Sequence, residues 1–453
     1  MSELNKIKKI YFIGIGGIGM SAIARYFKQK GCEVSGYDRT QTALTTQLEI
    51  SGISIHYEDN IELIPKDADA VVYTPAIPAN HAELLYYQVN GYQVVKRSDV
   101  LRWITEASFN ICVAGTHGKT TISTMVAHIL RHSGYGCNAF LGGISTNYQS
   151  NFWSSDNNVV VVEADEYDRS FLKLVPDIAI ITAMDADHLD IYGTEKEVED
   201  SFIQFSNKIK PNGALISKYG LKRKRELNAT KQFTYSLDNE NASVFAKNIK
   251  VENGHYIYDV QANGWELSDV QLNMGGLHNI ENSIAAIAVA KLLKISPEKI
   301  KLAVKDFKGV KRRFEYWLNT ANHVLIDDYA HHPEELRALI MGVRSLYGTE
   351  KITIVFQPHL FSRTRDFAKE FARSLDFADE VILLPIYPAR EMPIGGITSE
   401  VILQKMKLHN KNILSKEALM LWIQQNNPKI LVMAGAGDID TILNRVKEIL
   451  MNN

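Results

Sequence analysis

One short segment, AGTHGKTT at residues 114–121, restricts the fold more than any other part of the chain. It follows an apolar stretch typical of a buried strand, 109–114, and precedes an amphipathic helical pattern, 119–133. Glycines let consecutive backbone N–H groups converge on phosphate oxygens at the start of a helix. Lys119 would add positive charge at the β- and γ-phosphates, and Thr120 a hydroxyl for Mg²⁺. The segment therefore predicts a phosphate loop inside an α/β domain.

This loop departs from the general G-x-x-x-x-G-K-[ST] pattern at one position, because residue 113 is valine. The alternative is a glycine turn followed by a surface lysine. Strand, loop and helix nevertheless fall where nucleotide binding needs them, which favours the phosphate loop.

Acidic side chains follow two predicted buried strands. The strand at 159–162 runs directly into Glu163, Asp165, Glu166 and Asp168. Such a cluster can hold the metal ion that bridges nucleotide phosphates. The strand at 178–182 is followed by DADHLD at 185–190, which by itself is also consistent with a polar loop. A metallohydrolase site would need further histidine-rich elements, which the sequence does not supply.

The N-terminal part of the chain contains a second glycine turn. A predicted strand at 7–15, a helix at 20–30 and a strand at 33–37 enclose Gly14-x-Gly16-x-x-Gly19, and Asp38 follows. This spacing satisfies the dinucleotide fingerprint and predicts a backbone cradle for a diphosphate. NAD and a nucleotide sugar both carry one. An NAD-dependent oxidoreductase is therefore an alternative, but it leaves the phosphate loop unexplained.

Polar motifs also end the predicted strands of the C-terminal part. DDYAHHP at 327–333 and QPHLFSRTRD at 357–366 each follow an apolar strand. Arginine forks bind carboxylate and phosphate well, although ion pairs with neighbouring acids explain any single arginine almost equally. The GAGD turn at 435–438 is consistent with an ordinary βα turn.

The 453 residues are too many for one ordinary core. The order of strands, turns and helices predicts three α/β domains in series, at 1–106, 107–316 and 317–453. The first and third are expected to be Rossmann-like and the central one to be of the phosphate-loop ATPase type. Within the central domain, the polar stretch 210–275 predicts only shorter strand-like segments.

Composition excludes several classes of function. A formal net charge of -2 gives no general basic footprint for nucleic acid, and the basic run at 222–225 is typical of a solvated turn. Three widely spaced cysteines support neither a disulfide framework nor a cysteine metal site. Glycines interrupt the apolar N-terminal run, which argues against an export signal, and no stretch reaches the roughly 18 apolar residues of a membrane span. We expect a cytoplasmic protein with no membrane partner.

Taken together, these segments resemble the Mur ligases across essentially the whole chain. The order GIGGIGMSAIA, AGTHGKTT, EADEYDRSF, DADHLD, GLHNIENSIAA, DDYAHHPEE, QPHLFSRTRD and GAGD carries the resemblance. It implies a first domain for a UDP-sugar, a central ATPase domain and a C-terminal domain that closes for catalysis. The implied reaction joins L-alanine to the carboxylate of UDP-N-acetylmuramate through an acyl phosphate, with ATP as co-substrate and two Mg²⁺ ions, for peptidoglycan synthesis.

The resemblance also assigns individual residues. For the UDP-sugar they are Gly14, Gly16, Gly17, Gly19 and Asp38; for ATP they are Gly115, Thr116, His117, Gly118, Lys119, Thr120, Thr121, Asn279, Asn282, Arg313 and Asp328; for metal they are Thr120, Glu166 and His188; and for catalysis they are Lys119, His188, His359 and Arg363. His359 and Arg363 match positions that meet the incoming amino acid or a substrate carboxylate.

The chain departs from the family pattern at two points, and its sequence leaves two choices open. Some family members carry an arginine after the histidine of the QPH motif, where this chain has Leu360. No lysine matches the carbamylated lysine of several relatives. A sister ligase that adds a recycled peptide to the same nucleotide sugar is the alternative function. Monomer and homodimer are both compatible with the sequence.

Overall fold

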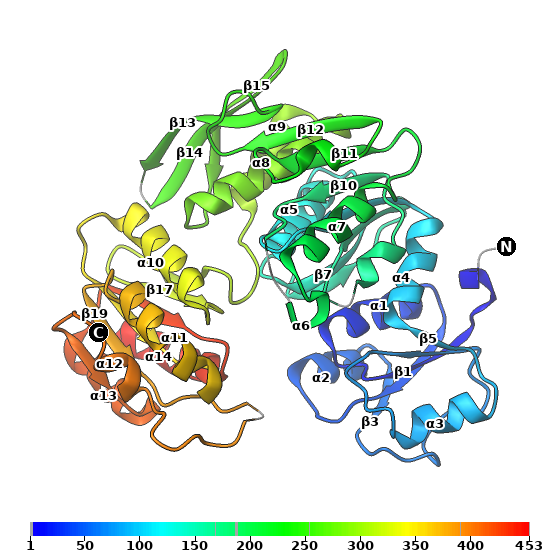
Figure 1. Cartoon of the computed structure of the whole chain (residues 1–453), viewed down its shortest axis with the longest axis horizontal. Helices are drawn as coiled ribbons and strands as arrows, with labels where there is room; N and C mark the ends of the chain where they lie inside the picture. The colour runs from blue at the N-terminus through cyan, green and yellow to red at the C-terminus, as the bar shows by residue number, and fades with distance from the viewer. Residues whose placement is uncertain (1–2, 168, 186–188, 253, 390, 453) are drawn as a thin grey trace. The chain divides into compact units, whose positions relative to one another are not determined.

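A computed structural model describes residues 3–167, 169–185, 189–252, 254–389 and 391–452. Three β-sheets of five, ten and six strands organise this chain, each flanked by helices (Figure 1). The predicted fold class, three α/β domains, is confirmed. The boundaries at 106 and 316 stay a prediction.

The first sheet has the order β3-β2-β1-β4-β5, with all of its strands parallel. Its strands are β1 (Lys9–Ile13), β2 (Glu33–Tyr37), β3 (Ser54–His56), β4 (Ala70–Tyr73) and β5 (Val94–Lys96), and its helices are α1 (Ile18–Gln29), α2 (Ala43–Ile50), α3 (Ala82–Val89) and α4 (Arg97–Glu106). The chain moves outward from β1 to β2 and β3, then crosses back to β4. The turn after β1 therefore lies at a topological switch point, where parallel sheets commonly bind ligands.

The second sheet has the order β15-β14-β13-β12-β11-β10-β6-β9-β7-β8. Its strands are β6 (Phe109–Ala114), β7 (Asn138–Ser145), β8 (Ser150–Trp153), β9 (Val159–Glu163), β10 (Ile178–Ile181), β11 (Ala214–Lys218), β12 (Lys231–Ser236), β13 (Val244–Glu252), β14 (His255–Ala262) and β15 (Trp265–Leu272). The helices are α5 (Lys119–His132), α6 (Leu189–Tyr192), α7 (Glu195–Ser206), α8 (Leu277–Leu292) and α9 (Pro297–Asp306). Strand β6 pairs in parallel with β9 and with β10, so the segments that follow these three strands share one edge of the sheet.

The expectation of only short strands at 210–275 is wrong. Strand β13 has 9 residues, and β14 and β15 have 8 residues each. Buried and half-buried residues alternate along the whole of β14. One half-exposed face makes the average composition polar, although the period of two is that of a strand.

The third sheet has the order β16-β17-β21-β18-β19-β20. Its strands are β16 (Glu315–Asn319), β17 (Val324–Asp328), β18 (Ile352–Phe356), β19 (Glu380–Leu383), β20 (Lys411–Ile413) and β21 (Ile430–Ala434), and its helices are α10 (Pro333–Tyr347), α11 (Phe361–Leu375), α12 (Glu400–Leu403), α13 (Lys416–Asn426) and α14 (Leu443–Asn452). Strand β21 pairs in parallel with both β17 and β18. The DDYAHHP, QPH and GAGD motifs therefore follow parallel strands at one edge.

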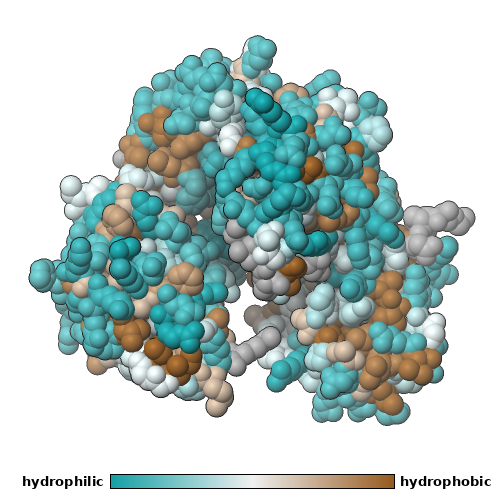
Figure 2. Space-filling model, in the orientation of Figure 1, coloured by the Kyte–Doolittle hydropathy of each residue, from teal (hydrophilic) through white to brown (hydrophobic). Residues whose placement is uncertain are grey.

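The chain divides into two compact units. One comprises Met1–Lys247, Val260–Leu267 and Glu281–Val304, and the other comprises Asn248–Asp259, Ser268–Ile280 and Lys305–Asn453. Hydrophilic residues cover most of the visible surface, and apolar residues form separate patches (Figure 2). Within the described ranges, no helix combines the length and apolar character needed to cross a bilayer.

Candidate active site

The phosphate loop joins β6 to α5 and needs its glycines. Gly115 has φ +129° and Gly118 has φ +78°, a backbone region that favours glycine. A Cβ atom on Gly118 would lie 2.8 Å from the side-chain oxygen of Asn282, and one on Gly115 would lie 2.8 Å from the amide nitrogen of Ala183. Helix α5 begins at Lys119, so the loop ends where unpaired helical N–H groups can meet an anion.

Lys119 and Thr120 each contact a carboxylate at the end of β9. The ammonium group of Lys119 lies 2.8 Å from the carboxylate of Glu166, whose side chain is 1% exposed. The hydroxyl of Thr120 donates to Glu163 at 3.0 Å. Burial raises the pKa of both carboxyl groups, and the charge of Lys119 opposes that rise. The sequence placed Glu163 in the acidic cluster that can hold a metal ion, but the resemblance assigned only Glu166 as a ligand.

The donor set at this edge fits Mg²⁺. Hydroxyl and carboxylate oxygens from Thr120, Glu163 and Glu166 are the ligand type that Mg²⁺ prefers, and Mg²⁺ commonly takes only one or two protein carboxylates and keeps several waters. Among the described residues, no group of three or more His, Cys, Asp or Glu side chains is arranged around a metal position. The predicted ligand His188 lies outside the described residues, as does Asp168.

The remaining loop residues fix its shape. The amide of Thr116 donates to Ala183 at 3.3 Å, and the hydroxyl of Thr182 donates to the carbonyl of His117. The side chain of His117 is exposed and lies 3.8 Å from Asp185. Thr121 is buried in the first turn of α5. The segment after β10 therefore supports the loop from one side.

Two asparagines of α8 were predicted near adenine. Asn282 lies against Gly118, as the glycine geometry shows, and it is therefore at the phosphate loop. Asn279 is buried and donates to the carbonyl of Gly275 at 2.6 Å. Its side chain therefore fixes the start of α8 within the second unit.

The first glycine turn is braced by the acid of its fingerprint. Gly14 has φ +86°, and a Cβ atom on Gly16 would lie 2.6 Å from a Thr45 methyl group. Asp38 accepts hydrogen bonds from the amides of Gly16 at 2.7 Å and Thr40 at 3.2 Å. Gly17 precedes the first residue of α1, so the turn presents a helix N-terminus at the switch point.

A pocket of about 130 Å³ links this turn to the acidic end of β9. Ile18 and Gly19 at the start of α1, Arg97 of α4, and Glu163 and Asp165 all line it. Arg97 lies so close to Gly19 that any side chain there would strike it. Gly19 of the predicted UDP-sugar set and Glu163, the hydrogen-bond partner of Thr120, therefore line the same space within the first unit.

In the second unit, Asp328 holds the segment that carries Arg313. Its carboxylate accepts from the amides of Phe314 at 2.7 Å and Ala330 at 2.8 Å. Burial raises the pKa of Asp328 to about 6, while the charge of Arg313 opposes the rise. The two predicted nucleotide-facing residues of this unit are thus neighbours.

His359 and Arg363 lie together after β18. The Nδ1 atom of His359 and one terminal nitrogen of Arg363 are buried without a hydrogen-bond partner in the part of the chain that is described. Burial lowers the pKa of His359, and Arg363 lowers it further. The imidazole is therefore mostly neutral at pH 7 and can accept a proton.

Sequence reasoning missed His331, whose ring contacts those of Tyr329 and His359. Its ring is 6.3 Å from that of His359 and 5.2 Å from that of Tyr329. Burial lowers the pKa of His331, and both Arg313 and Arg363 contribute to the decrease. Its place in the DDYAHHP motif, after a buried strand, was the available signal.

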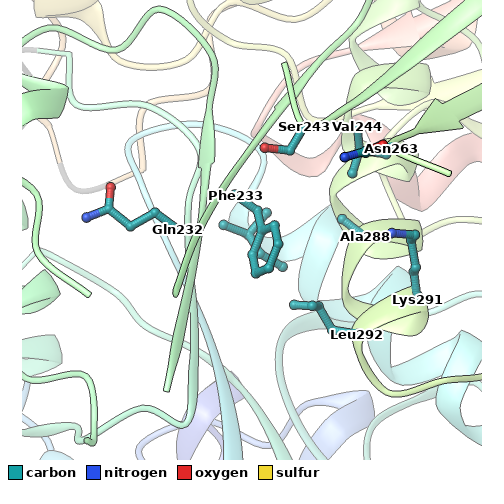
Figure 3. Close-up of a pocket in the computed structure, with 9 residues that line it drawn as sticks. Gln232, Phe233, Ser243, Val244, Asn263, Ala288, Lys291 and Leu292 are labelled. Atoms are coloured by element: carbon teal, nitrogen blue, oxygen red, sulfur yellow. The ribbon is translucent and has the colours of Figure 1, made fainter. Parts of the chain in front are cut away.

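A larger cavity, about 300 Å³, lies elsewhere in the first unit, between β11, β12 and α8 (Figure 3). Ile216, Phe233, Val244, Ala288 and Leu292 give it mainly apolar walls. None of the residues predicted for nucleotide, metal or catalysis lines it. The smaller pocket is therefore the better candidate for the chemistry.

Three α/β domains with a phosphate loop in the central one define a multidomain nucleotide-using enzyme. Family models match the chain at 9–109 (Mur ligase family, catalytic domain), 113–290 (Mur ligase middle domain) and 312–437 (Mur ligase, glutamate ligase domain). The chain belongs to the Mur ligase family, and it is a ligase. This membership argues against the oxidoreductase alternative.

Individual relatives are similar over their full lengths. The UDP-N-acetylmuramate--L-alanine ligase of Porphyromonas gingivalis is 50% identical over 98% of this chain and 99% of its own. The ligase of the same name from Flavobacterium johnsoniae is 48% identical over 100% of both chains. The crystal structure of the UDP-N-acetylmuramate-alanine ligase of Thermotoga maritima matches with a TM-score of 0.81 and 27% identity, over 98% of this chain and 99% of the other.

Proposed function

We propose that the chain forms the amide bond between L-alanine and the carboxylate of UDP-N-acetylmuramate, with ATP as co-substrate, in peptidoglycan precursor synthesis. The observation that carries this proposal is the pocket shared by the first glycine turn and the acidic end of β9. A diphosphate held at Gly14–Gly19 would place the sugar end of the nucleotide beside the phosphate loop. Full-length relatives that carry this activity in their names support the same assignment.

Activation of the carboxylate is the first chemical problem. A carboxylate is a poor electrophile, and its charge repels the γ-phosphate of ATP. Lys119 neutralises part of that charge after it exchanges Glu166 for a nucleotide phosphate, and Thr120 with Glu163 and Glu166 would hold Mg²⁺. Bound Mg²⁺ supplies further positive charge at the phosphates. We assign two ions, with His188 as a ligand of the second.

Amide formation follows from the acyl phosphate. Transfer of the γ-phosphoryl group to the carboxylate oxygen gives the acyl phosphate and ADP. The neutral amine of alanine then attacks the acyl carbon, and the tetrahedral intermediate releases phosphate. His359 accepts the amine proton through Nδ1, and Arg363 pairs with the alanine carboxylate, since each has a buried nitrogen without a hydrogen-bond partner among the described residues.

The same assignment places the other residues. Gly14, Gly16, Gly17 and Gly19 would cradle the UDP diphosphate with Asp38 as their brace, and residues 115–121 would bind the ATP phosphates. Asn279 and Asn282 are assigned near adenine, although Asn282 lies beside the phosphate loop at Gly118. Arg313 with Asp328 would face the nucleotide from the C-terminal domain. The domains run from 1 to 106, from 107 to 316 and from 317 to 453.

A phosphate-release assay tests the proposal. The purified chain is given UDP-N-acetylmuramate, ATP and Mg²⁺ with L-alanine, with a recycled-type tripeptide, or with no amine. We expect phosphate and ADP in equal amounts only when alanine is present, and a product whose mass equals both substrates minus water. Phosphate release with the tripeptide but not with alanine would identify the sister ligase. The absence of phosphate release with either amine would refute the proposal.

A further inference from the structure

The QPH segment contains a residue in an unusual backbone conformation. Leu360, between His359 and the start of α11, has φ +71° and ψ 136°. Residues other than glycine rarely occupy this region, and they remain there only where the surrounding structure enforces it. The position of His359 on one side and of α11 on the other therefore depends on what holds Leu360.

Helix α11 receives no hydrogen bond from a side chain at its own N-cap, Leu360. The first N–H groups of a helix need acceptors from elsewhere. Glu391 supplies them from 29 positions further along: its carboxylate accepts from the amide of Ser362 at 3.0 Å and from the Ser362 hydroxyl. These hydrogen bonds lower the pKa of Glu391, so the cap is charged, which suits the positive end of a helix.

The other side of Leu360 is held by Tyr387. The amide of Leu360 donates to the Tyr387 carbonyl at 2.9 Å, and the amide of Tyr387 donates to the Pro358 carbonyl at 2.8 Å. The rings of Tyr387 and His359 stack with centroids 5.8 Å apart and an interplanar angle of 18°. Tyr387 and Glu391 together therefore bracket Leu360 from both sides.

We propose that Tyr387 and Glu391, here called the clamp, hold His359 and Arg363 in the geometry that receives the amino-acid substrate, with Glu391 as the positioning residue. Arg363 lies in the first turn of α11, so a change at the Glu391 cap moves its guanidinium. A shift of about 1 Å at such a site can cost on the order of 100-fold in rate. This inference rests on the proposed function, in which His359 and Arg363 meet alanine.

Steady-state kinetics in the phosphate-release assay test the role of the clamp. We compare Glu391→Ala and Glu391→Gln with Glu370→Ala, which removes an exposed acid of helix α11 itself. For Glu391→Ala, KM for alanine should rise about 10-fold or more, whereas KM for ATP and for the nucleotide sugar should stay within about 2-fold. The glutamine variant should lose less, because its amide oxygen still accepts one hydrogen bond. Equal changes in all three KM values would show a merely structural role and overturn the proposal.

A double-mutant cycle with Leu360→Gly tests the mechanism. Glycine adopts φ +71° without cost, so the segment no longer needs to be forced into place. Glu391→Ala should then raise the alanine KM by about 3-fold or less in the Leu360→Gly background. Effects that simply multiply would show that the clamp does not act through the Leu360 backbone.

Hydrogen–deuterium exchange separates failure of the clamp from failure of the proposed function. Peptides that cover 358–364 should exchange faster in Glu391→Ala than in the wild type or in Glu370→Ala, since the Ser362 amide loses its acceptor. Faster exchange in a chain that does not ligate alanine would refute the proposed function and retain the clamp as a structural element. Unchanged exchange and unchanged alanine KM in an active chain would refute the clamp.

Discussion

The phosphate loop and the QPH segment both turn a chain from a buried strand into a helix that carries a functional side chain, but they are held by different means. In the phosphate loop, glycine occupies each position with positive φ, Gly115 and Gly118. In the QPH segment, the residue with positive φ is Leu360, and distant residues hold it. The backbone of the phosphate loop is determined by the glycines that adopt it. The backbone at Leu360 is held by hydrogen bonds from residues distant in the sequence.

This difference decides how each region responds to substitution. A loop that glycine makes possible fails when a side chain is added, because both the backbone and the available space resist it. A segment in which a residue other than glycine is held at positive φ should tolerate or even benefit from glycine, and it should fail when its distant support is removed. The following substitutions test this contrast, in order of expected effect.

Lys119→Ala should cause the largest loss, about 1000-fold or more in kcat, because in the proposed mechanism the lysine neutralises charge at the transferring phosphate. The structure adds a second consequence. Glu166, 1% exposed, loses its partner, so the variant should also be less stable by about 1–3 kcal/mol. Thermal unfolding and phosphate release measure the two effects.

The double variant Lys119→Ala with Glu166→Gln is the control for Lys119→Ala. It should regain part of the stability, because burying a neutral amide costs less free energy than burying an unpaired carboxylate, and it should stay inactive. Near-normal turnover in either variant would refute the assignment of the phosphate loop.

Gly118→Ala should lower kcat/KM for ATP by about 100-fold, through strain at φ +78° and a Cβ atom 2.8 Å from Asn282. Gly220→Ala is the matched control, because Gly220 has φ +83° and open space around a Cβ atom. It should lose about 1 kcal/mol of stability and keep its activity. Equal activity in the two variants would show that the loop tolerates a side chain.

Asp328→Asn should change how the free energy of unfolding depends on pH, more than its value at any single pH. Burial raises the pKa of folded Asp328 to about 6, above the 3.8 of an ordinary aspartate. As pH rises, the unfolded chain therefore loses this proton before the folded chain does. The stabilisation of the folded state by the protonated Asp328 is complete below pH 3.8 and is lost as pH rises through 6. Asparagine does not titrate.

Urea unfolding between pH 4 and 7 measures this effect. The free energy of unfolding of Asp328→Asn, minus that of the wild type, should increase across the interval by on the order of 1 kcal/mol. Subtraction cancels most of the titration of other buried acids such as Asp327. A difference that is flat or decreases with pH would show that the folded pKa is not raised.

The sequence predicts the parts of the molecule that local patterns determine. Strands β2, β6, β9 and β10 lie within one residue of the ranges expected from their apolar runs, and both glycine turns occur where their spacing placed them. Each of these signals is contained in fewer than about ten neighbouring residues, and burial on both faces of a parallel strand makes the run easy to read. The family assignment from the ordered motifs is confirmed as well.

Features that join distant residues were not predictable in this way. Nothing near Glu391 indicates that it caps a helix 29 positions earlier, and the role of Glu163 beside Thr120 requires the pairing of β6 with β9. The long strands β13 to β15 were underestimated because many of their residues are exposed or half-buried, which lowers the apolar content of the segment. The roles assigned to individual site residues stay predictions, and His188 lies outside the described residues.

Leu360→Gly should have the smallest effect, and it reverses the substitution made in Gly118→Ala. Two terms oppose each other: glycine removes strain of about 1–3 kcal/mol, but it also gives up the packing of a half-buried leucine and adds freedom to the unfolded chain. We therefore expect stability within about 1 kcal/mol of the wild type, with the alanine KM changed by no more than about 3-fold because the clamp remains in place. Chemical unfolding and the kinetic assay measure both quantities, and Leu414→Gly, at another half-buried leucine of the same unit, shows the cost of the same truncation without relief of backbone strain. If Leu360→Gly is as destabilising as Leu414→Gly, the backbone at 360 stores no strain, and the contrast between the two regions is lost.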